Sequence, residues 1–149
     1  EDEVSFVKEI TKVMRNKPII AAGKTTLRQF SALVKKSNLF IGVDSGPIHI
    51  AAAMKIPVVA LFGAADPDYL GPYGNNHIVI TKRKYFPCSP CAQTVCLRPA
   101  KSCMQAITVD EVWQTVKKQM ERIEKARRLE GGGSIQENGA NYTIENTTN

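Results

Sequence analysis

The sequence predicts an α/β fold of the Rossmann-like type, in which a parallel sheet carries helices on both faces. The first observation is that short apolar runs alternate with segments of helical periodicity along the chain. The second is that these runs are dense in Val, Ile and Leu, which is typical of strands buried on both faces. The third is that the loops richest in Gly, Pro and polar residues follow an apolar run. Such loops lie at the carboxyl ends of parallel strands, where folds of this class bind ligands.

Helical spacing occurs in four places, and two of them begin with a capping box, in which two side chains satisfy free N–H groups of the first turn. Thr26 pairs with Gln29 in the first box, and Thr108 pairs with Glu111 in the second. Phe30, Leu33 and Val34 form the stripe expected to be buried in the second helix. The expected helices are Glu3–Arg15, one starting at Thr26, Ile48–Met54, and a long one from Thr108 to about Arg128.

Four apolar runs predict the strands, and the remaining segments predict loops and a tail. The expected strands are Pro18–Ala22, Leu39–Val43, Pro57–Phe62 and His77–Thr81. We expect residues 1–129 to form one domain, truncated at its start because the first residue is Glu1 and not Met. Residues 130–149 are rich in Gly, Asn and Thr, which predicts a disordered tail.

The charge of the chain is concentrated in its predicted domain. The 149 residues carry a formal charge of +6, and the three acidic residues from Glu130 onward leave residues 1–129 with 20 basic minus 11 acidic residues, or +9. A basic body favours a polyanionic neighbour such as phosphates or an anionic membrane face, although a solvated basic surface gives the same composition. The apolar runs are strand-sized, so we expect a soluble globular piece without a membrane span.

The segment Gly42–Ala53 is the strongest candidate for a binding site. A strand ends there, a turn of small residues follows, and a helix begins with Pro47 in its first turn. Free N–H groups and the helix dipole at such a start favour an anion, and a phosphate fits well. Gly46 allows close approach of the backbone, and Ser45 and His49 offer further hydrogen-bonding groups. The alternative is that Asp44 or Ser45 only caps the helix and that His49 is a satisfied buried histidine.

A series of short motifs extends around this segment in a fixed order, and the series resembles the bacterial lipopolysaccharide heptosyltransferase family. Members of that family are glycosyltransferases of the two-domain, Rossmann-like GT-B type. The resemblance runs from Glu1 to about Met120. Besides Asp44-Ser45-Gly46 and His49, it is carried by Gly23-Lys24-Thr25-Thr26-Leu27, Leu39–Gly42, Pro57–Gly63, Gly71-Pro72, Cys88-Ser89-Pro90-Cys91, Cys96, Cys103-Met104 and Ile107-Thr108.

The resemblance implies that this chain is the C-terminal, donor-binding half of such an enzyme. The implied donor is a nucleotide sugar, usually ADP-heptose, and the implied acceptor is the lipopolysaccharide inner core. It implies donor contacts from Asp44, Ser45, Gly46 and His49, from the loop Gly23, Lys24, Thr25 and Thr26, and from Glu1 to the ribose. The general base is implied to be an Asp in the missing N-terminal half, so no catalytic residue is assigned here. No cofactor, no metal and no nucleic acid are implied, and the expected location is the cytoplasm, at the inner face of the inner membrane.

Other interpretations of three motifs remain. Gly23-Lys24-Thr25 before a helix is similar to a nucleotide phosphate loop, but that loop needs a glycine at position 18, which is Pro18. Four cysteines, Cys88, Cys91, Cys96 and Cys103, allow either a tetrahedral zinc site, conceivably in a module that touches nucleic acid, or reduced and packed thiols. Asp66 and Asp68 flank Pro67 and could act as an acid–base pair, although we expect them to form a turn.

Overall fold

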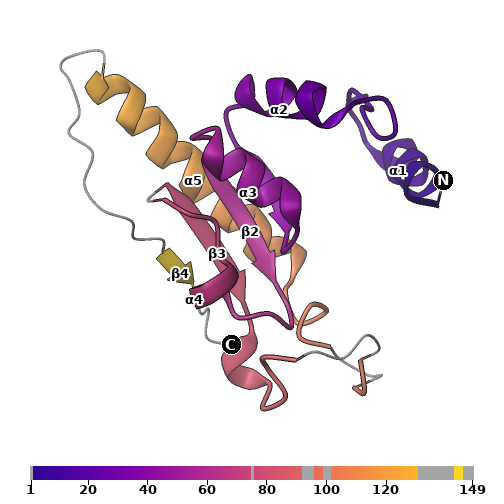
Figure 1. Cartoon of the computed structure of the whole chain (residues 1–149), viewed down its shortest axis with the longest axis vertical. Helices are drawn as coiled ribbons and strands as arrows, with labels where there is room; N and C mark the ends of the chain where they lie inside the picture. The colour runs from indigo at the N-terminus through magenta and orange to yellow at the C-terminus, as the bar shows by residue number, and fades with distance from the viewer. Residues whose placement is uncertain (1, 75, 92–95, 99–101, 131–142, 146–149) are drawn as a thin grey trace. The chain divides into compact units, whose positions relative to one another are not determined.

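The computed structural model describes residues 2–74, 76–91, 96–98, 102–130 and 143–145. The chain divides into two compact units, Glu1–Leu33 and Val34–Asn149, and each is described by itself. Figure 1 gives the order of the elements along the chain. In the part of the chain that the structure describes, no helix combines the length and the apolar character needed to cross a bilayer.

The second unit is built on a parallel sheet in the order β1-β2-β3-β4. Its strands are β1 (Phe40–Val43), β2 (Val58–Phe62), β3 (His77–Thr81) and the short β4 (Thr143–Glu145). Ile41 is in register with Val59 and Val59 with Ile78, so the first three strands run side by side. The predicted parallel sheet is therefore confirmed, and its carboxyl ends meet at one edge.

Helices cover both faces of this sheet, as predicted. Helix α3 (Gly46–Ala53) contacts β1 and β2, whereas α5 (Val109–Glu130) contacts β2 and β3. Side chains alternate between faces along a strand, and an ideal Cβ on Gly42 would lie 3.1 Å from Ile48 Cγ2, so α3 lies on the Gly42 face. Ile41 points the other way, and it lines a groove together with Val112 and Trp113 of α5.

The apolar side of α5 is only partly buried. Val109 and Trp113 are exposed, and Trp113 lines a groove of about 400 Å³ together with Ile41, Leu61 and Met104. Within the described residues, β1 lies at the edge of the sheet, and no strand covers its outer side. This face therefore leaves large apolar side chains in contact with solvent.

The first unit contains α1 (Asp2–Val13) and most of α2 (Leu27–Lys35). The capping box before α2 is confirmed, because Gln29 N–H donates to Thr26 Oγ1 at 3.3 Å and Thr26 N–H donates to Gln29 Oε1 at 2.9 Å. The strand predicted at Pro18–Ala22 is wrong. These residues form no ladder hydrogen bonds, and an isolated extended segment gains nothing from strand geometry without a neighbouring strand. Of the three residues expected to be buried on α2, Val34 is buried and Leu33 is exposed.

The segment predicted as a tail contains one element of regular structure. Thr143–Glu145 forms β4, which pairs with β3 in parallel, with Ile144 opposite Val79. Two of the three residues of β4, Thr143 and Ile144, are β-branched, and such residues favour strands. The prediction of a tail rested on the average composition of residues 130–149 and did not consider these two residues separately. The rest of the predicted tail after Glu130 lies outside the described residues.

The core contains one histidine, His77 at the start of β3, whose two ring nitrogens form hydrogen bonds with the start of β2 and with the loop before β3. His77 is 4% exposed, its Nδ1 accepts a hydrogen bond from Val58 N–H at 3.2 Å, and its Nε2 lies 3.0 Å from the Tyr73 carbonyl oxygen. This pattern requires the neutral ring with its proton on Nε2. Burial lowers the pKa of His77 below its ordinary value, and the hydrogen bond to Tyr73 opposes this effect.

We expect the free energy of unfolding to fall as the pH drops below about 6.5, the ordinary pKa of histidine. Below that value the unfolded chain binds a proton that the folded chain resists, so the slope reaches at most about 1.4 kcal/mol per pH unit. Urea unfolding between pH 7.5 and 5.5 measures it. His77→Asn keeps an acceptor near Val58 N–H and should flatten this dependence, whereas Gln114→Asn, at an exposed position without a titratable group, should leave it unchanged. An identical slope in all three proteins would contradict the role given to His77.

Candidate functional site

The loop Asp44–His49 leaves the carboxyl end of β1 and enters α3. Asp44 N–H donates to the Leu61 carbonyl at 3.1 Å, which fixes the start of the loop to the end of β2. Ser45 is the N-cap residue in extended conformation, with φ −164°, and Pro47 occupies the first turn. The strand, the turn and the helix start thus have the arrangement that the sequence predicted.

The first turn of α3 is not capped by a side chain. Ser45 makes no capping hydrogen bond, because its hydroxyl donates back to the Val43 carbonyl at 3.2 Å. Gly46 N–H has no hydrogen-bond partner among the described residues, and an ideal Cβ on Gly46 would meet no atom within 4 Å. A donor group therefore faces open space at the positive end of a helix dipole, which suits an anion.

The simpler interpretations of this loop do not match the structure. Ser45 does not cap the helix with its side chain, and His49 is exposed, not buried. The satisfied buried histidine of this chain is His77 instead. Ile48 is fully buried between α3 and the sheet, so it fixes the helix while His49 stays accessible on its first turn.

The second predicted donor loop, Gly23–Thr26, belongs to the first unit. Gly23 has a φ of +69°, which favours glycine, and Lys24 N–H donates to the Ala21 carbonyl at 3.0 Å to close a turn. Lys24 and Thr25 are exposed, while Thr26 caps α2. The contribution of this loop to donor binding stays a prediction, and Glu1 lies outside the described residues.

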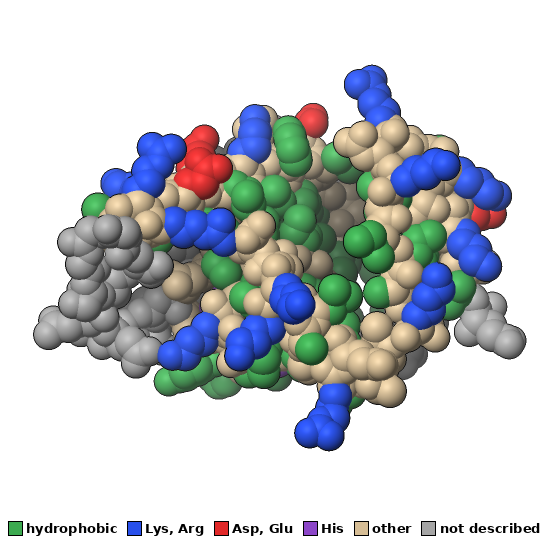
Figure 2. Space-filling view, turned by 90° about the horizontal axis from the view of Figure 1, so that it is seen from above, with side chains coloured by type: hydrophobic (Ala, Val, Ile, Leu, Met, Phe, Trp, Pro, Cys, Tyr) green, Lys and Arg blue, Asp and Glu red, His purple; other side chains and the backbone are tan. Residues whose placement is uncertain are grey.

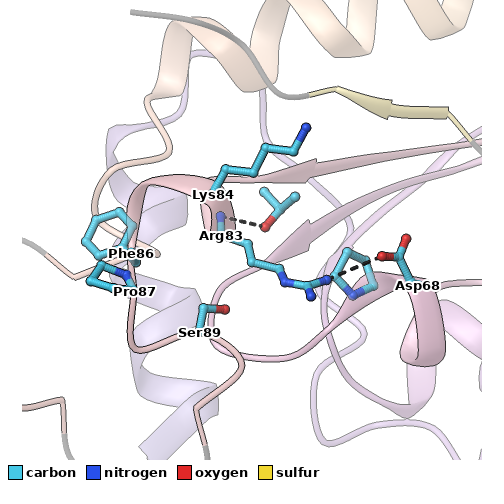
Figure 3. A pocket seen from close by; sticks show the side chains of 8 residues that line it. Asp68, Arg83, Lys84, Phe86, Pro87 and Ser89 are labelled. Atoms are coloured by element: carbon cyan, nitrogen blue, oxygen red, sulfur yellow. Dashed lines mark hydrogen bonds and ion pairs between the residues drawn. The ribbon is translucent and has the colours of Figure 1, made fainter.

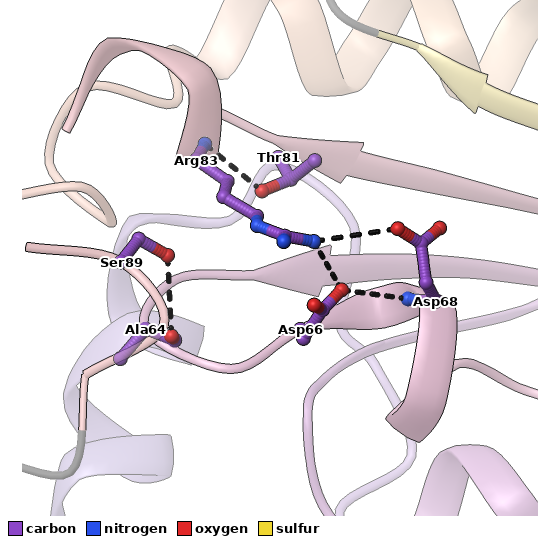
Figure 4. A network of polar contacts seen from close by, with 6 residues as sticks. All are labelled: Ala64, Asp66, Asp68, Thr81, Arg83 and Ser89. Carbon is purple, nitrogen blue, oxygen red and sulfur yellow. Dashed lines mark hydrogen bonds and ion pairs between the residues drawn. The ribbon is translucent and has the colours of Figure 1, made fainter. Parts of the chain in front are cut away.

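The carboxyl edge of the sheet in the second unit carries a polar network that the sequence did not reveal (Figure 4). Asp66 follows β2 and caps the short helix α4 (Pro67–Leu70) by accepting a hydrogen bond from Asp68 N–H at 3.0 Å. Arg83, just after β3, forms ion pairs with both Asp66 and Asp68. The turn-forming role predicted for the two carboxylates is thus confirmed, and the ion pairs also join the loops that follow β2 and β3.

A pocket of about 520 Å³ lies beside this network (Figure 3). The Arg83 guanidinium and the Ser89 hydroxyl lie in its wall, and Phe86 and Pro87 close one side. Ser89 Oγ donates to the Ala64 carbonyl at 3.3 Å, so the loop after β3 is fixed to the loop after β2. The full lining is Pro67, Asp68, Thr81, Arg83, Lys84, Phe86, Pro87 and Ser89.

In the part of the chain that the structure describes, none of the four cysteines forms a disulfide, and their surroundings differ. Packed thiols were expected, but Cys88 and Cys96 are exposed, whereas Cys91 and Cys103 are half-buried. Cys91 N–H donates to the Ala64 carbonyl at 2.9 Å. Among the described residues, no three His, Cys, Asp or Glu side chains are grouped closely enough to hold a metal ion. A zinc site at these cysteines gains no support from this arrangement.

Sequence comparison assigns the family. The model of glycosyltransferase family 9 (heptosyltransferase) matches residues 1–101, which include both predicted donor loops. The chain belongs to this family. Lipopolysaccharide heptosyltransferase 3 of Escherichia coli is 44% identical over 79 residues, which cover 52% of this chain and 23% of that protein. Lipooligosaccharide heptosyltransferase 2 of Campylobacter jejuni (strain 81116) is 29% identical over 119 residues, covering 78% of this chain and 37% of that protein.

A solved family 9 structure agrees with the fold. The glycosyl transferase family 9 protein of Veillonella parvula superposes with a TM-score of 0.64 at 25% sequence identity, covering 81% of this chain and 34% of that one. The predicted Rossmann-like α/β class is confirmed by this likeness and by the parallel sheet. The matches span about a quarter to a third of the length of these family 9 relatives.

Proposed function

We propose that this chain is the donor-binding, C-terminal half of a heptosyltransferase that moves heptose from ADP-heptose to the lipopolysaccharide inner core. The observation that carries the proposal is the start of α3, where Gly46 N–H faces open space without a capping side chain. The names of the relatives, lipopolysaccharide and lipooligosaccharide heptosyltransferases, supply the sugar and the acceptor.

The proposed reaction is a displacement at the anomeric carbon of the heptose. An acceptor hydroxyl oxygen forms a bond to that carbon, the bond from the carbon to the diphosphate oxygen breaks, and ADP leaves with the electron pair. The hydroxyl proton passes to a general base that this chain does not supply. Gly46 N–H and the dipole of α3 stabilise the negative charge that develops on the diphosphate. His49 and Lys24 are the side chains that we assign to further contacts with the donor.

Calorimetric titration of the folded chain with ADP, UDP and GDP tests this assignment. We expect ADP to bind most tightly, and we expect His49→Ala to weaken it about tenfold through loss of a hydrogen bond to the phosphate. Lys117→Ala, an exposed site on α5, is the control. A preference for UDP or GDP would mean that the chain belongs to a glycosyltransferase that uses a different nucleotide sugar as its donor. Failure of every nucleotide to bind a folded chain would count against the donor site.

We further propose that the protein works in the cytoplasm at the inner face of the inner membrane. The support is charge: residues 1–129 carry 20 basic and 11 acidic residues. Anionic acceptor lipids would attract such a surface. The candidate contacts are basic residues of α5, namely Lys117, Lys118, Arg122, Lys125, Arg127 and Arg128.

A further inference from the structure

A second pocket lies at the opposite edge of the sheet from the donor loop. It has a volume of about 280 Å³ and opens where the chain enters β1, β2 and β3, beside Asn38, Pro57 and Asn76. Helix α5 forms its other wall. The full lining is Ser37, Asn38, Lys55, Ile56, Pro57, Asn76, Gln119, Arg122, Ile123, Ala126 and Arg127, all within the second unit.

The charged side chains that line this pocket are all cationic. Lys55 follows α3, Arg122 and Arg127 lie on α5, and the described lining contains no Asp or Glu. Arg127 Nη2 donates to Asn38 Oδ1 at 2.6 Å, so a neutral amide orients this guanidinium without cancelling its charge. Figure 2 shows abundant Lys and Arg side chains and few acidic ones on one face of the molecule.

The helix dipoles account for only part of the positive charge that lines this pocket. The carboxyl ends of α3 and α5 point toward this edge, and cations near such ends are stabilised in any protein. Each end contributes about half a negative charge, so the two ends together contribute about one. Arg122 and Arg127 alone exceed that charge. Arg122 also lies eight positions before Glu130, the end of α5, and therefore outside its last turn.

One buried side chain in the wall lacks a hydrogen bond. Gln119 is 2% exposed, and its Nε2 donates to the Asn76 carbonyl at 2.5 Å. That bond identifies which amide atom is the nitrogen and which is the oxygen, because exchanging them would place two acceptors together. Gln119 Oε1 then accepts no hydrogen bond from any described residue. A buried acceptor of this kind calls for a donor such as a hydroxyl group.

We propose that this pocket binds a phosphate group attached to a hydroxyl-bearing alcohol, such as a polyol phosphate. Arg122, Arg127 and Lys55 bind the phosphate, and Gln119 Oε1 accepts a hydrogen bond from the neighbouring hydroxyl once the amide turns slightly toward the pocket. Both a free polyol phosphate and the headgroup of an anionic phospholipid have this chemistry. The site is separate from the donor loop and does not depend on the function proposed for that loop.

Titration of the chain at constant ionic strength, followed by NMR, tests the proposal with two free probes. Glycerol 3-phosphate should bind more tightly than inorganic phosphate, because only the former supplies the hydroxyl donor. A third probe, vesicles of phosphatidylglycerol compared with phosphatidylcholine in a sedimentation assay, distinguishes a headgroup from a free ligand. Binding to glycerol 3-phosphate assigns the free source, and binding only to the phosphatidylglycerol vesicles assigns the lipid.

Three variants show whether the binding is in the pocket. Arg122→Ala should weaken binding of the active probe at least tenfold, whereas Lys12→Ala removes the same charge from an exposed position outside the pocket and should change it less than twofold. Gln119→Leu should abolish the preference for glycerol 3-phosphate over inorganic phosphate. Equal weakening by Arg122→Ala and Lys12→Ala, or no binding of any probe to the folded chain, would overturn the site. A preference that survives in Gln119→Leu would overturn the role of that side chain.

Discussion

Gly46→Ala should reduce the affinity for ADP about 100-fold without reducing the stability of the chain. A methyl group on residue 46 would occupy the open space above its N–H, where we place the diphosphate. A loss of this size corresponds to about 2.7 kcal/mol. The free chain has room for the methyl group, since no atom lies within 4 Å of the ideal Cβ. Alanine is also the better helix former, by up to about 1 kcal/mol.

Calorimetry with ADP and thermal unfolding, both carried out on the same variant, measure the two effects separately. Gly63→Ala is the matched control, because the same methyl group there would lie 2.6 Å from Met104 Cγ and should lower the melting temperature. Gly46→Ala with unchanged ADP affinity would refute the position assigned to the diphosphate. A lower melting temperature in Gly46→Ala would instead mean that the substitution disturbs the start of α3.

Phe62→Ala should lower the free energy of unfolding by about 3–5 kcal/mol. Phe62 is fully buried at the end of β2, and its removal leaves a cavity that the surrounding strands fill only in part. Domains of this kind are stable by about 5–15 kcal/mol, so this loss removes a large share of the stability. Urea unfolding followed by circular dichroism gives the difference.

Phe6→Ala provides the matched control for the core substitution. Phe6 is 66% exposed on α1, so the same deletion should cost less than about 1 kcal/mol. Similar losses for both variants would show that burial of Phe62 does not determine its contribution. The comparison also keeps the chemistry of the change constant, because both variants remove a benzyl side chain.

The sequence predicted the three long strands well because each is an uninterrupted apolar run. Leu39–Val43, Pro57–Phe62 and His77–Thr81 each begin within one residue of the observed strand and end at the same residue. Such runs are stable only as buried strands or helices, and their short length favours strands. The run Pro18–Ala22 has the same appearance, but a strand also needs a neighbour, and the composition of one segment contains no information about its neighbour.

The position of the candidate loop was predicted from the sequence, but its hydrogen bonds were not. The position of Asp44–His49 between a strand and a helix follows from local patterns. Whether Ser45 caps that helix depends on a side-chain torsion, which no pattern determines. The ion pairs of Arg83 with Asp66 and Asp68 join residues 15 and 17 positions apart, and they become neighbours only through the pairing of β2 with β3. Cys88 and Cys96 were expected to be packed, but both are exposed. Their burial depends on the path of the loop, which the sequence pattern does not determine.

The two edges of the sheet have connections of very different length. Four residues link α3 to β2 at the amino edge, whereas residues 82–108 separate β3 from α5 at the carboxyl edge. A change of sequence in the long connection alters side chains that line the pocket beside Arg83, while the buried residues of β2 and β3 keep their partners. Homologues can therefore diverge in what they recognise through this connection and retain the same folding core. In directed evolution toward a new donor or acceptor, libraries confined to residues 82–108 should yield a larger share of folded variants than libraries of equal size in the strands.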